Sequence, residues 1–475
     1  MLYDEMTYIL SPIILVATSL IVLLVEFITK KKSALLLTTV TGLGISTIIL
    51  FIQYLSFDQQ KSIFFGTLIF DKFYLFSAIV LMIITSSIII GFYDYLNKQI
   101  SFVSEFISLI LLSLVGSLFV IMAVDFVTIY LSLELSSLPI IALIAFGRGK
   151  FSLEASFKYL ILASFSTGIF LTGVAYIYGV TGSLSLEIIN ISEINPAVTL
   201  GIIFIFIGLA FKLSIAPWHM WTPDTYQGSP MPVVTYLSTA SKVAGFVLAI
   251  RLFSEIFSDS FTYSNLIILL SLISLASMTI GNLGAILQKD LKRLFAYSTV
   301  AHAGYMIIGV IALISSNSSA STTMFYVVGY AITNISVFFS LQHMMNLTKS
   351  TSIDSIKGLF QAYPFVSIIF GLGILSLLGI PATVGFMGKV LVFSSAVNNG
   401  LVLLAVAGVI NSFVSAYYYL GLLRNVFVSS DKFEQNGNSN NTYILVASIS
   451  SVLVLVLGVY PDLILSTIDN VISGL

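Results

Sequence analysis

The chain has 475 residues, of which 58% are apolar and 9% are charged, and its mean hydropathy is +1.06. Soluble domains are roughly half apolar and a quarter charged, so this composition excludes a soluble fold. With 20 basic and 21 acidic residues the net charge is −1, and no excess of positive charge exists to hold a nucleic acid.

Apolar runs of roughly 20 residues, the length that crosses a bilayer as a helix, follow one another along the whole chain. The expected spans lie at about 8–29, 35–55, 73–92, 103–122, 125–146, 155–179, 199–221, 231–253, 264–284, 295–315, 321–345, 366–395, 400–427 and 443–468. Strands of a membrane β-barrel alternate over about ten residues instead. The sequence therefore predicts an all-α polytopic membrane protein with about 14 transmembrane helices in one membrane domain, 1–475.

The distribution of basic residues predicts the orientation of these spans. The N-terminal stretch carries Asp4 and Glu5 and no basic residue before Tyr8, unlike a signal peptide, so the first span is expected to be retained. With the N-terminus outside, thirteen Lys and Arg lie at inner loops or span ends and three at outer ones. The inner set is Lys30, Lys31, Lys32, Lys98, Arg148, Lys150, Lys289, Lys292, Arg293, Lys349, Lys357, Arg424 and Lys432, and the outer set is Lys61, Lys72 and Arg251. Positive charge favours the inner side, and an even number of spans then places both termini outside.

Two of the expected spans contain a lysine and are interrupted by proline. The seventh contains Pro217, and the twelfth contains Pro381 among several glycines. Broken helices at corresponding places in two halves are typical of transporters with internal repeats, which bind at the breaks. We expect two five-helix repeats, 101–254 and 264–427, and since five is an odd number the two must have opposite topologies in the membrane.

Glu134 is the carboxylate that the sequence places deepest in a span, about 14 Å along the helix at 1.5 Å per residue. A charge at that depth is costly, so it should face the protein interior and have a partner. Two interpretations stay open: a structural ion pair between helices, or a carboxylate of a proton relay.

The four basic residues left over from the loops, Lys158, Lys212, Lys242 and Lys389, all lie inside spans. Lys212 precedes Pro217 by five residues and so borders a stretch where carbonyls lose their helical partners. Burial disfavours a protonated lysine and a nearby carboxylate favours it, so a lysine whose carboxylate contact changes can load and release a proton.

The other three lysines differ in how deep they lie. Lys242 follows four small residues, which leave room for water, and Lys389 follows Pro381 in a run too long for one straight helix. A lysine that cannot reach the membrane surface is expected to be functional. Lys158 lies only about three residues into its span, so its ammonium group has two alternatives: reaching the inner surface as a snorkelling side chain, or serving an inner gate. These lysines and Glu134 are candidates for one polar axis at mid-membrane.

Histidines offer a second type of proton-transfer group within the spans. We select His219 and His302 as candidates, because their near-neutral titration suits transfer between lysines, against the alternative of hydrogen-bonded interior histidines. The three histidines of the chain show no zinc-binding spacing, so no metal site is expected. The chain has no cysteine, which excludes Cys-ligated iron–sulfur centres and places any electron transfer in another subunit.

Several long motifs resemble one family. Residues 211–228 (FKLSIAPWHMWTPDTYQG) are similar to the subunit N family of proton-pumping NADH-quinone oxidoreductase, respiratory complex I, and the resemblance continues through 237–242 (LSTASK), 281–285 (GNLGA), 288–298 (QKDLKRLFAYS) and 302–305 (HAGY). Related antiporter-like subunits carry blocks similar to 288–298, so the discrimination depends on the seventh-span motif. A lysine at 389 resembles subunits N and L rather than M, and an L-type chain would need a long lateral helix after about residue 468.

The resemblance implies roles for the candidate residues. Glu134 and Lys212 would be a carboxylate–lysine pair that controls lysine protonation, Lys242 the central relay, and Lys389 the residue that exchanges protons with the far side. Lys158 would help to link the inner entry to this axis.

The resemblance also implies partners and a location. Quinone, NADH or another reduced carrier, flavin and iron–sulfur centres would belong to partner subunits, with further antiporter-like membrane subunits and a peripheral electron-transfer arm. Quinone reduction there would drive protons through this chain. The predicted location is the plasma membrane of a prokaryote, with a thylakoid or organelle membrane as the alternative. The rival functions are a subunit of a multisubunit Na⁺/H⁺ antiporter and an inert membrane scaffold.

Overall fold

The computed structural model describes residues 5–29, 31–186, 195–256, 264–314, 319–429 and 441–474. Within these ranges, 13 helices are long and apolar enough to cross a bilayer. The twelfth expected span is not one of them, because it is divided into two shorter apolar helices. Counted together, those halves complete the predicted set of spans and confirm the predicted all-α membrane fold.

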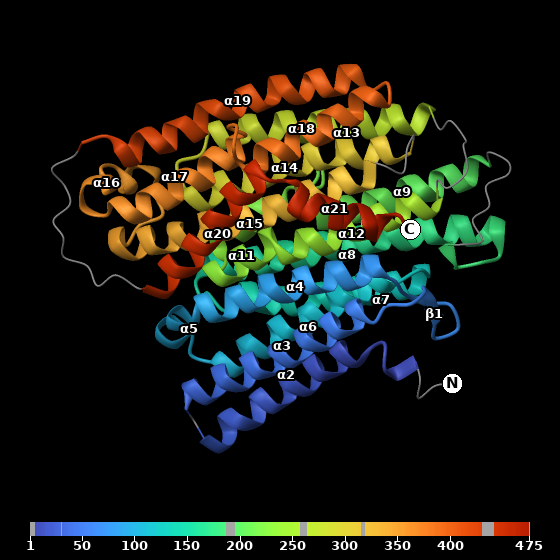
Figure 1. Ribbon diagram of the computed structural model, residues 1–475, viewed down its shortest axis with the longest axis horizontal. Coiled ribbons are helices and arrows are strands. Elements are labelled where there is room, and N and C mark those ends of the chain that lie inside the picture. The colour runs from blue at the N-terminus through green and yellow to red at the C-terminus, as the bar shows by residue number, and fades with distance from the viewer. Residues whose placement is uncertain are drawn as a thin grey trace. The chain divides into compact units, whose positions relative to one another are not determined.

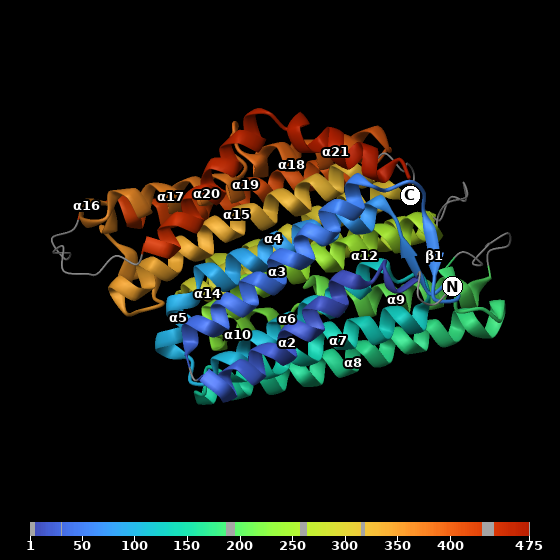
Figure 2. The same ribbon diagram turned by 60° about the horizontal axis from the view of Figure 1, so that its bottom comes forward.

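The chain forms two compact units, of which the first comprises Met1–Leu213, Gly228–Ser260 and Asn470–Leu475. Its helices pack as neighbours in sequence, with α2 beside α3 and α7 beside α8 (Figure 1, Figure 2). Its elements are α2 (Leu10–Thr29), α3 (Lys32–Leu55), β1 (Lys61–Ile63), β2 (Leu68–Phe70), α4 (Lys72–Gly91), α5 (Tyr93–Gln99), α6 (Val103–Met122), α7 (Phe126–Ala145), α8 (Lys150–Thr181), α9 (Pro196–Leu213), α11 (Met231–Ser238) and α12 (Ala240–Ile256).

The second unit comprises Ser214–Gln227 and Phe261–Asp469. Within it α13 packs along α14, and α15 contacts α17, α18 and α20. Its elements are α10 (Trp221–Gly228), α13 (Ser264–Ile286), α14 (Leu291–Leu313), α15 (Ser319–Thr348), the 3₁₀ helix η2 (Ile353–Ile356), α16 (Leu359–Ala362), α17 (Pro364–Leu378), α18 (Val384–Asn398), α19 (Val402–Phe427), α20 (Asn441–Val459) and α21 (Asp462–Ile472).

Both predicted helix breaks are present. α9 ends at Leu213, four residues before Pro217, and α17 ends at Leu378, three residues before Pro381. Proline ends a helix because its ring clashes with the preceding turn and it has no N–H to donate. The repeat bounds 101–254 and 264–427 remain a prediction.

Three boundaries differ from the prediction. α8 begins at Lys150, five residues before the expected start of its span. The expected eighth span is divided at Thr239 into α11 and α12. The last expected span is divided at Pro461, between α20 and α21, because proline cannot continue the helix that precedes it. A short antiparallel hairpin, β1–β2, pairs Lys61 with Phe70 and was not predicted.

A buried ion pair ties α12 to the start of α4. The Arg251 guanidinium donates to both carboxylate oxygens of Asp71, at 2.8 and 3.0 Å, and to the Ile121 carbonyl at 3.1 Å. Asp71 also caps α4 by accepting from the Tyr74 N–H at 2.7 Å. The charge count treats Arg251 as a residue of an outer span end, but the structure buries it completely. Breaking such a pair leaves a buried charge and costs about 3–5 kcal/mol.

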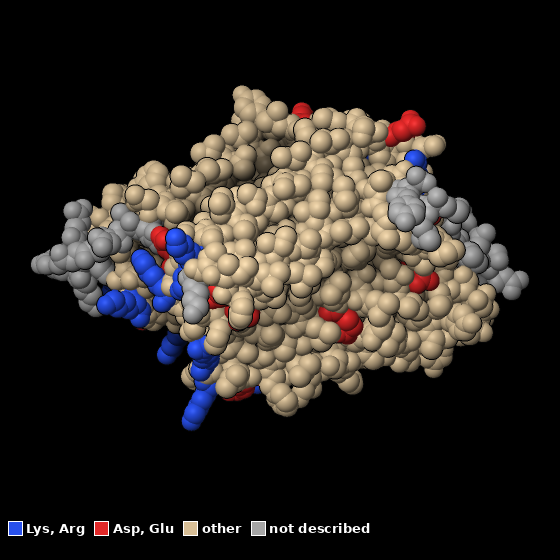
Figure 3. Space-filling model, turned by 90° about the horizontal axis from the view of Figure 1, so that it is seen from below, with Lys and Arg blue, Asp and Glu red and all other residues tan. Residues whose placement is uncertain are grey.

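Uncharged residues dominate the face of the space-filling view in Figure 3, where the Lys and Arg side chains gather toward one side of the view. The scarcity of charged side chains on this face agrees with spans that face lipid. Lys30 and Lys432, which the charge count places in inner loops, lie outside the described residues. The sides on which the termini lie stay a prediction.

Candidate functional site

The break after α9 frees backbone carbonyls in the first unit. In a continuing helix, residue 217 would donate its N–H to the Leu213 carbonyl, but this residue is proline and has no N–H. Ser214 has a left-handed φ of 60°. The carbonyl of Lys212 instead accepts a hydrogen bond from the Lys242 ammonium group at 3.2 Å. Both lysines are buried, at 5% and 2% exposed. The structure therefore brings Lys212 and Lys242 together, through a backbone group that the break exposes.

Two serine hydroxyls receive the ammonium group of Lys212. Its Nζ donates to Ser136 Oγ at 2.7 Å and to Ser137 Oγ at 3.4 Å. Ser136 in turn donates to the Leu133 carbonyl at 3.0 Å, which leaves its oxygen lone pairs for the lysine. These serines follow Glu134 on α7, so the carboxylate and the lysine's hydroxyl partners come from the same turn of helix.

Glu134 does not form a direct ion pair with Lys212 in the described part of the chain. Its Oε1 accepts a hydrogen bond from Thr167 Oγ1 at 2.7 Å. Glu134 and Lys212 instead line one cavity, together with Ser137, Ser166 and Thr167. The centre of a water molecule can occupy about 30 Å³ of this cavity. One water needs roughly 10–15 Å³, so there is room for water between the carboxylate and the ammonium group.

Thr167 has two acceptors for its single hydroxyl proton. Besides Glu134, the Ala163 carbonyl lies 2.9 Å from Thr167 Oγ1. A threonine hydroxyl has one proton to donate and rotates to suit its surroundings. An ionised Glu134 can draw this proton, whereas a protonated one can itself donate to the hydroxyl oxygen while Thr167 turns to the carbonyl.

The second break binds a lysine more directly. α17 ends at Leu378, and Gly379 follows with φ of 91°. The position that would donate to the Leu377 carbonyl is Pro381, four residues later. Lys389 Nζ donates to the carbonyls of Leu377 and Leu378, at 3.0 and 2.9 Å, and to Ser412 Oγ at 2.9 Å. A Cβ on Gly379 would lie 3.1 Å from Lys389 Cδ, so glycine at this position suits both the backbone angle and the lysine.

His302 lies in a network of buried hydroxyl groups in the second unit. Its Nδ1 is 2.8 Å from the Tyr326 hydroxyl and its Nε2 is 3.2 Å from the Tyr419 hydroxyl, which is 2.5 Å from Ser298 Oγ. The Lys389 ammonium lies 5.0 Å from the centre of the Tyr305 ring, within the range of a cation–π interaction. The structure thus surrounds His302 with groups that can both donate and accept protons.

A buried asparagine continues this network. Asn282 Nδ2 is 3.1 Å from the Tyr305 hydroxyl and 2.9 Å from the Asn411 carbonyl, and Asn282 Oδ1 accepts from the Tyr418 hydroxyl at 3.1 Å. None of these tyrosines and asparagines is among the site residues predicted from sequence. The available signal was position: Tyr305, Tyr326 and Tyr419 lie well inside spans, whereas membrane tyrosines usually gather at the interfaces.

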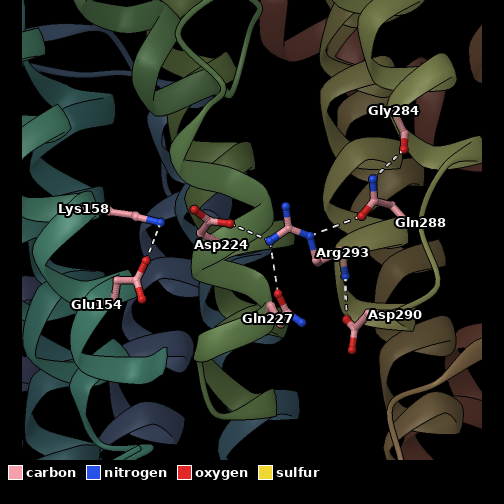
Figure 4. A network of polar contacts seen from close by, with 8 residues as sticks. All are labelled: Glu154, Lys158, Asp224, Gln227, Gly284, Gln288, Asp290 and Arg293. Atoms are coloured by element: carbon pink, nitrogen blue, oxygen red, sulfur yellow. Dashed lines mark hydrogen bonds and ion pairs between the residues drawn. The ribbon is translucent and has the colours of Figure 1, made fainter. Parts of the chain in front are cut away.

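Two predicted residues have other surroundings. Lys158 is 43% exposed and forms an ion pair at 2.7 Å with Glu154, one turn earlier on α8 (Figure 4). His219 lies in the second unit in the stretch between α9 and α10, 9% exposed, with its ring 6.2 Å from the Tyr297 ring. Of the described residues, no group of three or more His, Asp or Glu could hold a metal ion.

Comparisons with known proteins agree on one family. Residues 123–415 match the family model described as NADH:quinone oxidoreductase/Mrp antiporter, TM. The chain is 33% identical over 474 residues to NADH-quinone oxidoreductase subunit N of Dehalococcoides mccartyi, covering 96% of this chain and 97% of that one.

Solved structures show the same similarity. A chain of respiratory complex I from Thermus thermophilus aligns with a TM-score of 0.82 at 30% identity, over 96% of this chain and 98% of that chain. A chain of the Mrp complex from Dietzia aligns with a TM-score of 0.87 at 19% identity, over 99% and 97%, which shows a shared fold.

Proposed function

Because the chain belongs to the NADH:quinone oxidoreductase/Mrp antiporter family, we propose that it is the subunit N of a complex I-type enzyme and moves protons across the membrane. Its sequence similarity to subunit N extends over nearly the whole chain, whereas its similarity to the Mrp complex is one of fold. This difference favours a complex I subunit over a subunit of a Na⁺/H⁺ antiporter.

The observation that carries the proposal is the pairing of each helix break with a buried lysine. Lys242 binds the carbonyl of Lys212 at the first break, and Lys389 binds two carbonyls at the second. An intramembrane ammonium group is costly to keep and marks an ion pathway by default. Carbonyl dipoles stabilise the protonated lysine without fixing it permanently in that state, as a carboxylate in direct contact would.

In the first unit, Glu134 sets the charge state of Lys212 through the intervening cavity. When Glu134 is ionised, its charge favours protonated Lys212 across the water-sized space. When Glu134 takes up a proton, that support is lost and Lys212 can release its own. Lys242, held by the backbone of Lys212, is the next acceptor in the relay.

In the second unit, His302 and the hydroxyls of Tyr326 and Tyr419 form a route for protons, and Lys389 exchanges them with the far side. His219 lies in the irregular stretch after the first break, where its ring can relay a proton. Lys158, partly exposed beside Glu154, connects the inner entry to this relay.

Energy for this movement comes from elsewhere in the assembly. This chain is the non-redox part, and the reduced carrier, NADH or another, the quinone, flavin and iron–sulfur centres act in partner subunits. Its partners are further antiporter-like membrane subunits and a peripheral electron-transfer arm. The membrane is the plasma membrane of a prokaryote, with both termini outside. Quinone reduction in the partner subunits acts on this chain by changing the electrostatic field along its lysines.

The test is quinone-driven proton pumping in sealed vesicles that contain the assembled complex, comparing wild type with Lys242→Ala. We expect pumping to fall about 100-fold, the lower end of what a positioned proton-transfer group contributes, while the complex still assembles. Lys98→Ala, at an exposed position on α5, is the matched control and should pump like wild type.

Two outcomes would overturn the proposal. Unchanged pumping in Lys242→Ala would show that this lysine is passive and would favour a scaffold. Pumping by the wild type that requires Na⁺, lost when K⁺ replaces Na⁺ on both sides of the vesicle, would favour the antiporter function.

A further inference from the structure

The stretch that follows the break of α9 is attached to α13 and α14 in the second unit. The Ala216 N–H donates to Ser277 Oγ of α13 at 3.3 Å, and Ser277 donates to the Val300 carbonyl of α14 at 2.9 Å. The His219 ring lies against Tyr297. The third attachment is an ion pair between Asp224 of α10 and Arg293 of α14.

The attachment points on α14 are Arg293 and Tyr297, which are contacted directly, and Val300, which is reached through Ser277; they stand at positions i, i+4 and i+7. Residues with this spacing lie on one face of a helix. The irregular stretch and α10 are therefore attached to α14 along a single stripe, which runs from the first turn of that helix toward its middle.

Arg293 is placed where a helix does not favour a cation. Asp290 is the N-cap of α14, and its side chain accepts from the backbone N–H of Arg293 at 3.0 Å, so Arg293 lies in the first turn, at the positive end of the helix dipole. A cation there opposes the dipole. The helix itself does not favour an arginine at this position, so what the guanidinium binds accounts for it.

The guanidinium binds three side chains (Figure 4). Nη1 donates to Asp224 Oδ1 and, at 3.1 Å, to Gln227 Oε1, and Nε donates to Gln288 Oε1 at 3.2 Å. Asp224 and Gln227 both belong to α10. The side chains of Arg293 and Asp224 are 27% and 30% exposed, so the pair lies at the edge of the protein and is accessible to substitution without opening the core.

α14 carries His302 as well. His302 follows Arg293 by nine residues, which places it about 180° around the helix from the stripe that holds the irregular stretch. One rigid helix thus has the break segment on one face and the His302 hydroxyl network on the other.

From these contacts we propose that the Asp224–Arg293 ion pair is a positioning contact for proton transfer. It holds the chain out of helix between Leu213 and Trp221 by anchoring α10 to α14, and it fixes α14 in the position that His302 requires. This inference rests on the proposed function, since the effect of the ion pair is measured as proton movement.

The test uses the assembled complex in sealed vesicles and measures protons pumped per quinone reduced. Asp224→Asn and Arg293→Gln should each lower this ratio roughly threefold or more, as expected for residues coupled through one contact. The charge-reversed double variant, Asp224→Arg with Arg293→Asp, should restore the ratio to near wild type. An acidic residue at 293 also suits the helix dipole, so reversal does not weaken the start of α14.

Matched controls come from the neighbouring segment. Asp354→Asn and Lys357→Gln remove one acid and one base at exposed positions within and just after η2, and both should pump like wild type. Arg293→Gln removes the cation that opposes the dipole, so a loss of pumping in a normally assembled complex reflects the lost ion pair.

The outcomes separate this inference from the proposed function. Normal pumping in both single variants, or a reversed double variant no better than the singles, would overturn the positioning role. Lys242→Ala measured in the same vesicles tells whether pumping itself runs through this chain: if that variant pumps normally, the proposed function has failed, and if it does not, only the positioning role has.

Discussion

Each of the two helix breaks has a buried lysine nearby, but the groups that bind the ammonium differ. At the first, Lys212 binds serine hydroxyls near Glu134, and a second lysine, Lys242, takes the carbonyl that the break exposes. At the second, Lys389 alone takes two carbonyls, a serine hydroxyl and the face of a tyrosine ring. Of the described contacts of Lys389, none is with a carboxylate.

This difference indicates a division of labour. The first break has a titratable acid and a water-sized cavity, so the charge of its lysine can be changed by a neighbour. The second break stabilises its ammonium by dipoles that do not titrate, and supplies instead a histidine with hydroxyl partners. The first region is suited to switching, and the second to passing protons onward.

The largest expected effect is on assembly of the complex, and it should differ between the two breaks. Lys389→Met would leave the Leu377 carbonyl without its donor and the Leu378 carbonyl with only Ser412 Oγ at 3.4 Å, and a buried unpaired group costs about 1–3 kcal/mol. Lys212→Met should cost less, since Ser136 keeps its bond to Leu133. The yield of assembled complex and its Tm after extraction measure the effect of each variant. Equal decreases in yield and Tm for the two variants would contradict the difference between the breaks.

The next effect is on pumping and belongs to the first break. Glu134→Gln should lower pumping roughly 100-fold, as loss of an acid–base group does, with normal assembly because the amide oxygen still accepts from Thr167. Thr167→Val is the matched variant and should have a smaller effect, because the carboxylate stays. If Glu134→Gln pumps like wild type, the acid is structural and the switching role is wrong.

The smallest effect is expected in the hydroxyl network of the second break. Tyr419→Phe removes the group shared by Ser298 and His302, and one hydrogen bond contributes about 0.5–1.5 kcal/mol. Because Tyr326 still binds His302, we expect pumping to fall about two- to threefold, within the range of that energy. Tyr417→Phe, next to it but 74% exposed, is the control. Equal rates for the two variants would remove Tyr419 from the route.

Much of the fold could be predicted because its signals are local in sequence. Length and hydropathy define the spans, and Pro217 and Pro381 each remove a backbone donor at a known distance from the helix end. The same reasoning placed Lys212 and Lys389 beside the breaks. Lys212 is next to the end of α9 along the chain, whereas Lys389 reaches the Leu377 carbonyl from twelve residues away.

The partners of these lysines could not be predicted, because they depend on which helix faces meet. Ser136 and Ser412, which bind the lysines, and Thr167, which binds Glu134, are ordinary residues in sequence and become partners only through packing. The tyrosines around His302 are likewise not distinguished by sequence from the chain's other tyrosines, and only packing buries Tyr326 and Tyr419 almost completely. Lys158 lies eight residues after the start of α8, farther into its helix than hydropathy indicated, yet its side chain is 43% exposed beside Glu154.

The buried pair of Asp71 and Arg251 also sets an order of events during synthesis. The two residues are 180 positions apart, and a chain made N-terminus first at about 5–20 residues per second takes roughly 10–40 seconds to cover that distance. Asp71, at the start of α4, is synthesised well before its arginine, so α12 enters the membrane with its counter-charge already in place. The first helices thus serve the later ones as a docking platform, and a chain that lost α4 would expose the Arg251 guanidinium at the moment of insertion.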